Sequence, residues 1–341
     1  MPAIGVDTHK ATLAACAVDD LGSALAERTF ANDPAGHAAL LAWSIALLPV
    51  GRTGLEGSAG YGAALARFLV AHQREVCEVP PQLSHRERLR TRRAGKSDPG
   101  DALAIARVTA REPNLPPVRL ADPSHELQLL VEAREDLVTE ATRVRNRLHA
   151  DLVVLLPGYQ ATAANLVALR SRRSVAARLR PLRGIQAELA RDRLSRLGRL
   201  TIEAKVLETR IAGIVGDHPL LAVSGAGALT AAKIIGEVGD IGRFRSADAF
   251  AMLAGVAPIP ASSGQTNRMR LNRGGNRQLN RAFHSIALVQ AQHHPPAKAF
   301  IARKRSEGKT QREAIRALKR HLARVVFRIL VSPSEVAALA A

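Results

Sequence analysis

The chain has 341 residues, a length that allows two or three domains and a sizeable apolar core. Lysine and arginine together number 49 against 30 acidic residues, so the formal net charge is +19 at pH 7. Such an excess favours a polyanionic partner, with nucleic acid as the leading candidate. Aromatic residues make up only 3% of the chain, which argues against a protein that reads bases by stacking them on rings.

Targeting and redox features are few. The N-terminal sequence MPAIGVDTHKATLAACAV has no basic segment ahead of an apolar core, so it does not resemble a signal peptide. No apolar run is long enough to cross a membrane, and we expect no membrane partner. Cys16 and Cys77 make neither a disulfide framework nor a zinc site, and both are expected to be small buried hydrophobes. The expected location is a reducing cytoplasm, with association to the nucleoid.

The first third of the chain alternates between strand and helix patterns. Residues 3–30 are predicted to form three short strands with tight turns, an antiparallel meander. A helix is predicted next, because Asn32 or Asp33 can cap it and Pro34 suits its first position. A strand, a helix, a strand and a further helix follow, an order typical of an α/β domain with a mixed sheet. The proline-rich stretch 111–124 is predicted to be a linker.

The rest of the chain is predicted to be helical. Residues 125–216 contain two long amphipathic segments, which predict a helical hairpin or coiled coil. From residue 217 the sequence is rich in glycine and breaks into short helices, and its tail is helical and basic. The predicted fold class is therefore α/β plus all-α. The predicted domains are a mixed-sheet domain over 1–112, a linker and helical connector over 113–216, and a mainly helical C-terminal domain over 217–341.

Four acidic residues stand where carboxylates can converge. Asp7 and Glu56 end predicted strands, and Asp98 and Asp101 open a predicted helix, three residues apart and so on one side of it. Hard divalent ions such as Mg²⁺ prefer oxygen ligands, and two ions about 3.5–4 Å apart can clamp the oxygens of a phosphodiester. Each acid alone has a structural alternative, as a strand-end cap, an arginine partner or a helix-start charge. Their combination favours a metal site.

A glycine turn lies within LAVSGAGALTAAKIIGEVGDIGRF, residues 221–244. Gly225 and Gly227 between two short apolar segments are typical of a helix-hairpin-helix, whose backbone amides can hold a phosphate without reading sequence. A tight interhelical turn without a ligand has the same pattern. Both interpretations stay open.

Three motifs, GVDTHK, LEGSAGYG and KSDPGDALAIAR, resemble in order and spacing the acidic motifs of the DEDD transposases of insertion-sequence family one-ten. The resemblance implies an N-terminal domain similar to the Holliday-junction resolvase RuvC, with a ribonuclease-H-like fold. It also implies that Asp7, Glu56, Asp98 and Asp101 are a catalytic set that binds Mg²⁺, or Mn²⁺ in its place. The residues of the preceding basic run expected to contact nucleic acid are Arg90, Arg92, Arg93 and Lys96.

The segment GVAPIPASSGQTNRMRLNRGGNRQLNRAF resembles the C-terminal transposase domain of the same family. In that family the serine before the glycine attacks DNA, which implies a nucleophilic role for Ser263, beside Gly264. Ser262 takes that place if the alignment shifts by one residue. A serine hydroxyl is weakly nucleophilic, and no histidine lies next to it in sequence. Its activation is therefore expected from the metal site or an arginine.

The same segment departs from the family at one point. Gly275 and Asn276 match the family's "GN", but the family usually has "LR" after it, and here Leu279 is followed by Asn280 and then Arg281. The residues expected to contact nucleic acid in this segment are Arg268, Arg270, Arg273, Asn276 and Arg277. An arginine guanidinium can clamp a phosphate with two parallel hydrogen bonds.

The resemblance implies a transposase or recombinase of a bacterial insertion sequence, acting through a phosphoserine intermediate and guided by a structured bridge RNA. Its partners are then the DNA of the element ends and the target, that RNA, and further copies of the chain in a homodimer or homotetramer. Specificity carried by base pairing fits the lack of an evident base-reading motif. Two alternatives stay open: a RuvC-like structure-specific nuclease that uses water as nucleophile, and a non-enzymatic basic nucleic-acid-binding protein.

Overall fold

The computed structural model describes the chain except residues 49–50, 59, 91–97, 119–122, 261–268, 273 and 333–341. It divides into two compact units, Met1–Asp122 and Pro123–Ala341, each of which is described by itself. Within the described residues, no helix is both long enough and apolar enough to span a bilayer.

The first unit is built on a five-stranded mixed sheet of order β3-β2-β1-β4-β5. Its strands are β1 (Ala3–Thr8), β2 (Thr12–Val18), β3 (Ala24–Ala31), β4 (Arg52–Glu56) and β5 (Glu75–Glu78). The first three form an antiparallel meander, whereas β4 pairs parallel with both β1 and β5. This arrangement confirms the predicted mixed sheet and its meander.

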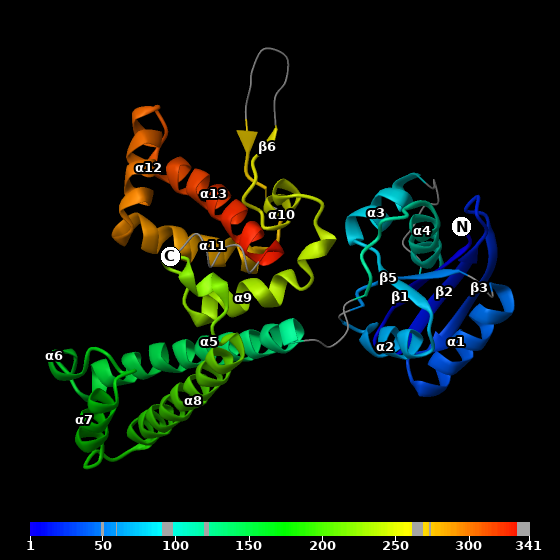
Figure 1. Cartoon of the computed structure of the whole chain (residues 1–341). Coiled ribbons are helices and arrows are strands. Elements are labelled where there is room, and N and C mark those ends of the chain that lie inside the picture. The colour runs from blue at the N-terminus through cyan, green and yellow to red at the C-terminus, as the bar shows by residue number, and fades with distance from the viewer. Residues whose placement is uncertain are drawn as a thin grey trace. The chain divides into compact units, whose positions relative to one another are not determined.

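Four helices cover the two faces of this sheet: α1 (Pro34–Leu47), α2 (Ala63–Ala71), α3 (Pro81–Arg90) and α4 (Asp98–Arg111). Figure 1 shows α1 and α2 on one face, and α3 and α4 on the other. Successive side chains of a strand point to opposite faces, so the residues of β1 pack alternately against the two helix layers. Ile4 and Val6 belong to the core under α1 and α2, whereas Ala3 packs with Ala102 and Ala106 of α4.

Helix α4 approaches the sheet where two neighbouring strands lack side chains. A Cβ added at Gly5 of β1 would lie less than 3.0 Å from the backbone of both Ala102 and Ala106. A Cβ at Gly54, the register partner of Gly5 on β4, would lie less than 3.0 Å from Thr109 Oγ1. Glycine at both positions therefore sets how closely α4 lies on the sheet.

Gly5→Ala is expected to lower the stability of the first unit by about 3 kcal/mol, because the added methyl must displace helix backbone rather than a flexible side chain. Differential scanning calorimetry measures the effect. The matched control is Gly213→Ala in the second unit, where an added Cβ meets nothing within 4 Å and the same substitution should be neutral or slightly stabilising. Equal melting of the Gly5→Ala and wild-type proteins would contradict the close packing described here.

The second unit begins with two long helices, α5 (Pro123–Leu155) and α8 (Ile185–Val215), joined at one end by α6 (Gln160–Ala163) and α7 (Leu169–Leu179). They lie side by side and antiparallel (Figure 1). The ion pairs between them are Glu126–Arg210, Arg134–Glu208, Glu140–Arg196 and Asp151–Arg193. The two predicted long helices are confirmed; their coiled-coil character stays a prediction.

The remaining elements of this unit are mainly helical, as predicted. The helices are α9 (Ala228–Val238), α10 (Ala247–Leu253), α11 (Arg277–His293), α12 (Pro295–Ser306) and α13 (Gln311–Val331), and two strands, β6 (Ile259–Pro260) and β7 (Met269–Arg270), pair antiparallel. Phe250 and Phe283 are fully buried in the core between them. These helices and the α5–α8 pair belong to one compact unit, so the predicted domain boundary at 217 stays a prediction.

Candidate active site

Two of the predicted acids end neighbouring parallel strands. Asp7 of β1 and Glu56 of β4 are register partners, two residues beyond the partner pair Gly5 and Gly54. Since side chains two residues apart share a face of the sheet, Asp7 and Glu56 lie on the face that α4 covers. Their carboxylates therefore belong to one edge of the sheet, at the carboxyl ends of β1 and β4.

The direction of α4 brings its first turn to the same edge. Arg52, the first residue of β4, donates from Nη1 to the carbonyl of Glu112, just past the end of α4, at 3.0 Å. Helix α4 therefore runs opposite to β1 and β4, and it begins at their carboxyl ends. From Ala102, beside Gly5, back to Asp98 the helix rises about 6 Å, and from Gly5 to Asp7 the strand rises about 6.6 Å.

The described carboxylates of this edge each have a partner. Asp7 Oδ2 lies 3.2 Å from His9 Nε2. The Ser84 hydroxyl donates to Glu56 Oε2 at 2.5 Å. Asp101 Oδ1 lies 3.0 Å from Nη1 of Arg88, and the Asp101 side chain is only 7% exposed.

The side chain of Asp98 lies outside the described part of the chain, although α4 begins at that residue. Among the described residues, no three His, Cys, Asp or Glu side chains are grouped closely enough to hold a metal ion. The backbone thus brings Asp7, Glu56 and the first turn of α4 to one edge, while the described carboxylates do not converge on a common point. Their role as metal ligands stays a prediction.

A fifth carboxylate at this edge fixes the loop after β4. Glu78 accepts hydrogen bonds from the backbone amides of Gly57 and Ser58, at 3.1 and 3.0 Å. Thr8 adds a bond from its hydroxyl to the carbonyl of Glu56, at 3.0 Å. The chain turns sharply at Gly57, whose φ of +78° is a conformation that residues with a side chain rarely adopt. These contacts hold the position of Glu56.

The chemistry of the donors suits a hard cation. Asp7, Glu56 and Asp101 present only carboxylate oxygens, the ligand type that Mg²⁺ and Mn²⁺ accept. The thiols are elsewhere: Cys16 and Cys77 are buried, as predicted. Burial raises the pKa of Cys16 to about 12 and the pKa of Cys77 to about 11, so both stay protonated at neutral pH. Neither is therefore suited to bind a soft metal or to act as a nucleophile.

The predicted basic run is described only at its start. Arg90 is the last residue of α3, is exposed, and lies 3.7 Å from Glu87. Arg92, Arg93 and Lys96 lie outside the described residues.

The glycine turn at 225–227 has a packing explanation. Gly225 has a φ of +87°, and an added Cβ would lie 3.1 to 3.2 Å from Val289 and the carbonyl of Ile286 in α11. Gly227 precedes α9, which has no side-chain cap. The element before the turn is a short 3₁₀ helix, Pro219–Ala222. A helix-hairpin-helix that binds phosphate stays a prediction.

The predicted nucleophile lies on a segment whose flanks are described. Ser263, with Ser262, Gly264 and Arg268, falls outside the described residues, and so does Arg273. The flanks are β6 and β7, which pair through Ile259 with Arg270 and Pro260 with Met269. Arg270 is exposed, as is Arg277 at the start of α11.

The "GN" motif, Gly275 and Asn276, stabilises the base of the β6–β7 hairpin, the name used below for the antiparallel pair β6 and β7 with their immediate flanks. A Cβ at Gly275 would lie less than 3.0 Å from Gly255, so the two backbones touch. Asn276 caps α11, accepting from the amide of Leu279 at 2.9 Å, and donates to Glu237 at 2.6 Å. The Asn276 side chain therefore has a structural role, and its contact with nucleic acid stays a prediction.

Asn280, which stands where the family usually has an arginine, makes two structural contacts. Asn280 donates to the carbonyl of Gly255 at 2.8 Å, and its Oδ1 accepts from Lys319 of α13. Burial lowers the pKa of Lys319. Asn280 thereby ties the base of the hairpin to α13.

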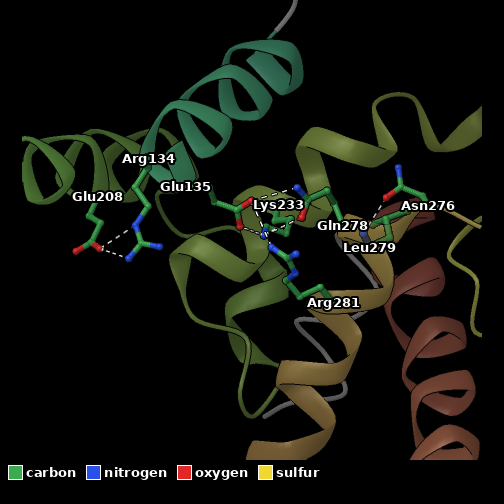
Figure 2. A network of polar contacts seen from close by, with 8 residues as sticks. All are labelled: Arg134, Glu135, Glu208, Lys233, Asn276, Gln278, Leu279 and Arg281. Atoms are coloured by element: carbon green, nitrogen blue, oxygen red, sulfur yellow. Dashed lines mark hydrogen bonds and ion pairs between the residues drawn. The ribbon is translucent and has the colours of Figure 1, made fainter. Parts of the chain in front are cut away.

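Arg281, the next arginine along, belongs to a network around Glu135 of α5 (Figure 2). Lys233 of α9 forms an ion pair with Glu135, Gln278 donates to it at 3.1 Å, and Arg281 lies 3.7 Å away. Burial acts to raise the pKa of Glu135, but the hydrogen bonds from Lys233 and Gln278 and the charges of Lys233 and Arg281 together outweigh it and keep that pKa below its usual value. The network joins α5 to α9 and α11.

Comparisons with known proteins define the class. Residues 4–157 match a family model described as "Transposase", specific to the DEDD transposases of the IS110 type. Residues 217–302 match a second model, described as "Transposase IS116/IS110/IS902 family". The protein is a transposase by class. It belongs to the IS110/IS116 family, and its resemblance to insertion-sequence family one-ten is confirmed.

Curated relatives align over nearly the whole chain. The "Insertion element IS900 uncharacterized 42 kDa protein" of Mycobacterium paratuberculosis is 28% identical, over 96% of this chain and 94% of its own. The "Pilin gene-inverting protein" of Moraxella lacunata is 25% identical, over 96% and 95%. Among solved structures, T. thermophilus RuvC in complex with a Holliday junction substrate aligns with 35% of this chain and 99% of its own, at 17% identity and a TM-score of 0.28.

Proposed function

We propose that this transposase cleaves and exchanges DNA strands through a covalent phosphoserine intermediate formed by Ser263, with the acidic set Asp7, Glu56, Asp98 and Asp101 as its metal site. The observation that carries the proposal is the placement of Asp7 and Glu56 as register partners at the edge where α4 begins. The ribonuclease-H-like character of the first unit is part of the proposal, and the meander followed by parallel strands supports it.

When bound at this edge, Mg²⁺ or Mn²⁺ would stabilise the charge that builds up on the phosphate oxygens during displacement. Asp7, Glu56, Asp98 and Asp101 would hold the cation. Membership of the transposase family and the net charge of +19 support DNA as the substrate.

The serine step keeps the number of phosphoester bonds unchanged. The Ser263 hydroxyl loses its proton, its Oγ forms a bond to phosphorus, and the deoxyribose oxygen leaves and takes up a proton. One phosphoester bond replaces another, so the reverse attack by a different DNA hydroxyl can rejoin strands without an external energy source. Strand exchange needs this property, whereas hydrolysis by water loses it.

Partners beyond DNA are also part of the proposal. A structured bridge RNA would pair with the element ends and the target, and would leave backbone contacts to the arginines of the chain. The exposed Arg90, Arg270 and Arg277 are described candidates for such contacts. A homodimer or homotetramer would supply the sites needed to cut more than one strand.

The test uses the full chain purified with its co-expressed RNA, Mg²⁺ and labelled DNA that carries the element's junction. A denaturing gel is expected to show labelled DNA linked to protein. Cleaved DNA ends without any adduct would favour the alternative in which water is the nucleophile and Ser263 is structural. Neither product, together with DNA binding, would favour the non-enzymatic alternative.

A further inference from the structure

Helix α3 supplies a partner to two of the proposed metal ligands. Ser84 and Arg88 are four residues apart and so lie on one side of this helix. The hydroxyl of Ser84, a fully buried residue, donates to Glu56, and the guanidinium of Arg88 pairs with Asp101. One turn of α3 therefore holds the ends of both carboxylates.

The Arg88–Asp101 pair is unequal in burial. The Asp101 side chain is 7% exposed and that of Arg88 is 31% exposed. A buried carboxylate without a partner costs free energy, so the guanidinium of Arg88 stabilises the ionised Asp101. The exposed part of Arg88 gives it a path away from Asp101 toward solvent.

A metal ion at Asp101 would compete with this arginine. Mg²⁺ binds carboxylate oxygens at about 2.0–2.1 Å, and the guanidinium Nη1 already lies 3.0 Å from Asp101 Oδ1. Two cations next to one carboxylate repel each other strongly where water is scarce. Asp7, Glu56 and Asp101 each have a different partner among the described residues: His9, Ser84 and Arg88.

We propose that Arg88 is an internal counter-cation of the metal site: it holds Asp101 while the site is empty, and a divalent cation must displace it to bind there. Arg88 is thus a positioning residue that lowers the affinity for metal and compensates the buried negative charge of Asp101 in the metal-free protein. Ser84 keeps Glu56 oriented in both states. This inference rests on the metal site of the proposed function.

The test is a titration of the full-length protein with Mn²⁺, with free Mn²⁺ followed by electron paramagnetic resonance. Arg88→Gln and Arg88→Met remove the charge, and the methionine keeps an apolar stem in place if the glutamine variant does not fold. Both are expected to bind Mn²⁺ about tenfold more tightly, the effect of losing one competing ion pair of moderate strength. Arg88→Lys keeps the charge and should return the affinity to near the wild-type value.

Two control variants distinguish the role of Arg88 from the existence of the metal site. Arg86→Gln removes the same charge from an exposed position of α3 and should leave the affinity unchanged. Asp7→Asn with Glu56→Gln identifies the Mn²⁺ that binds at the acidic set, because that binding should be lost.

Unchanged or weaker Mn²⁺ binding in the Arg88→Gln and Arg88→Met variants, with acid-dependent binding present in the wild type, would overturn the role of Arg88 alone. Binding that is insensitive to the acidic double variant would overturn the metal site itself, and this inference with it. Thermal unfolding gives a second readout: the charge-removing variants should be less stable than wild type without metal and should gain more stability from Mn²⁺.

Discussion

Ser263→Ala is expected to abolish protein-linked DNA and to reduce strand cleavage by at least about a thousandfold, because no other group replaces a covalent nucleophile in place. Binding of RNA and DNA should stay within about twofold of wild type, since one hydroxyl contributes little to contacts with phosphates. Labelled junction DNA on a denaturing gel measures the adduct, and a mobility shift measures binding.

The neighbouring serine provides the matched control. Ser262→Ala changes the same atoms one residue earlier, and it should leave the adduct intact. Adduct formation by the Ser263→Ala protein would disprove the assignment, and its loss only in the Ser262→Ala protein would move the nucleophile by one residue.

Asp7→Asn combined with Glu56→Gln should reduce metal-dependent cleavage by about a thousandfold or more, because the two carboxylates at the ends of β1 and β4 would hold the cation that offsets charge on the phosphate. The replacements keep side-chain size and hydrogen-bonding capacity, so the unfolding temperature is expected to change little. Cleavage rates with Mg²⁺ and with Mn²⁺, beside a thermal unfolding curve, test both statements.

Asp33→Asn is the control for this double variant. Asp33 is an acid of the same unit that caps α1 through the amide of Gly36, and asparagine caps helices equally well. It should cleave at the wild-type rate. Full cleavage by the acidic double variant would show that these carboxylates are structural.

Much of the first unit is predictable because its capping residues and strand patterns indicate the same elements that the structure contains. Asp33 and Pro34 mark the start of α1 by capping and by the fixed φ of proline, and the structure begins the helix there. The strand predicted before Asp7 is a short apolar run, and both predicted strands end in an acid; β1 and β4 prove to be neighbouring strands at the centre of the sheet. Their adjacency in register follows from the parallel pairing of β1 and β4.

Helix α3 is the main feature that the sequence does not reveal. Its sequence, PQLSHRERLR, has few apolar residues, and its buried positions include Ser84 and Glu87, so the usual amphipathic pattern is missing. Glu87 pairs with Arg111 of α4 at 2.7 Å. Polar contacts with α4 and β4 position this helix. No periodic pattern or motif in the sequence therefore connects Ser84 and Arg88 with the acidic site.

The hairpin base in the second unit is unpredictable for a different reason. Gly255 and Gly275 touch across 20 residues of sequence, and Asn280 reaches Lys319 across 39. Such contacts depend on the packing of α10, α11 and α13, which no local pattern specifies. The family's motif therefore identifies the segment, while only the structure shows that Asn276 and Asn280 support it.

The most direct test of the phosphoserine intermediate is to identify the residue that carries DNA. The covalent adduct is digested with nuclease and trypsin, and the peptide from residue 246 to 268, bounded by Arg245 and Arg268, is fragmented in a mass spectrometer. A phosphoserine intermediate at Ser263 predicts a residual nucleotide joined through its phosphate to Ser263, with Ser246, Ser262 and Thr266 of the same peptide unmodified. A nucleotide on any other residue, or cleavage of the junction DNA with no modified peptide, would contradict it.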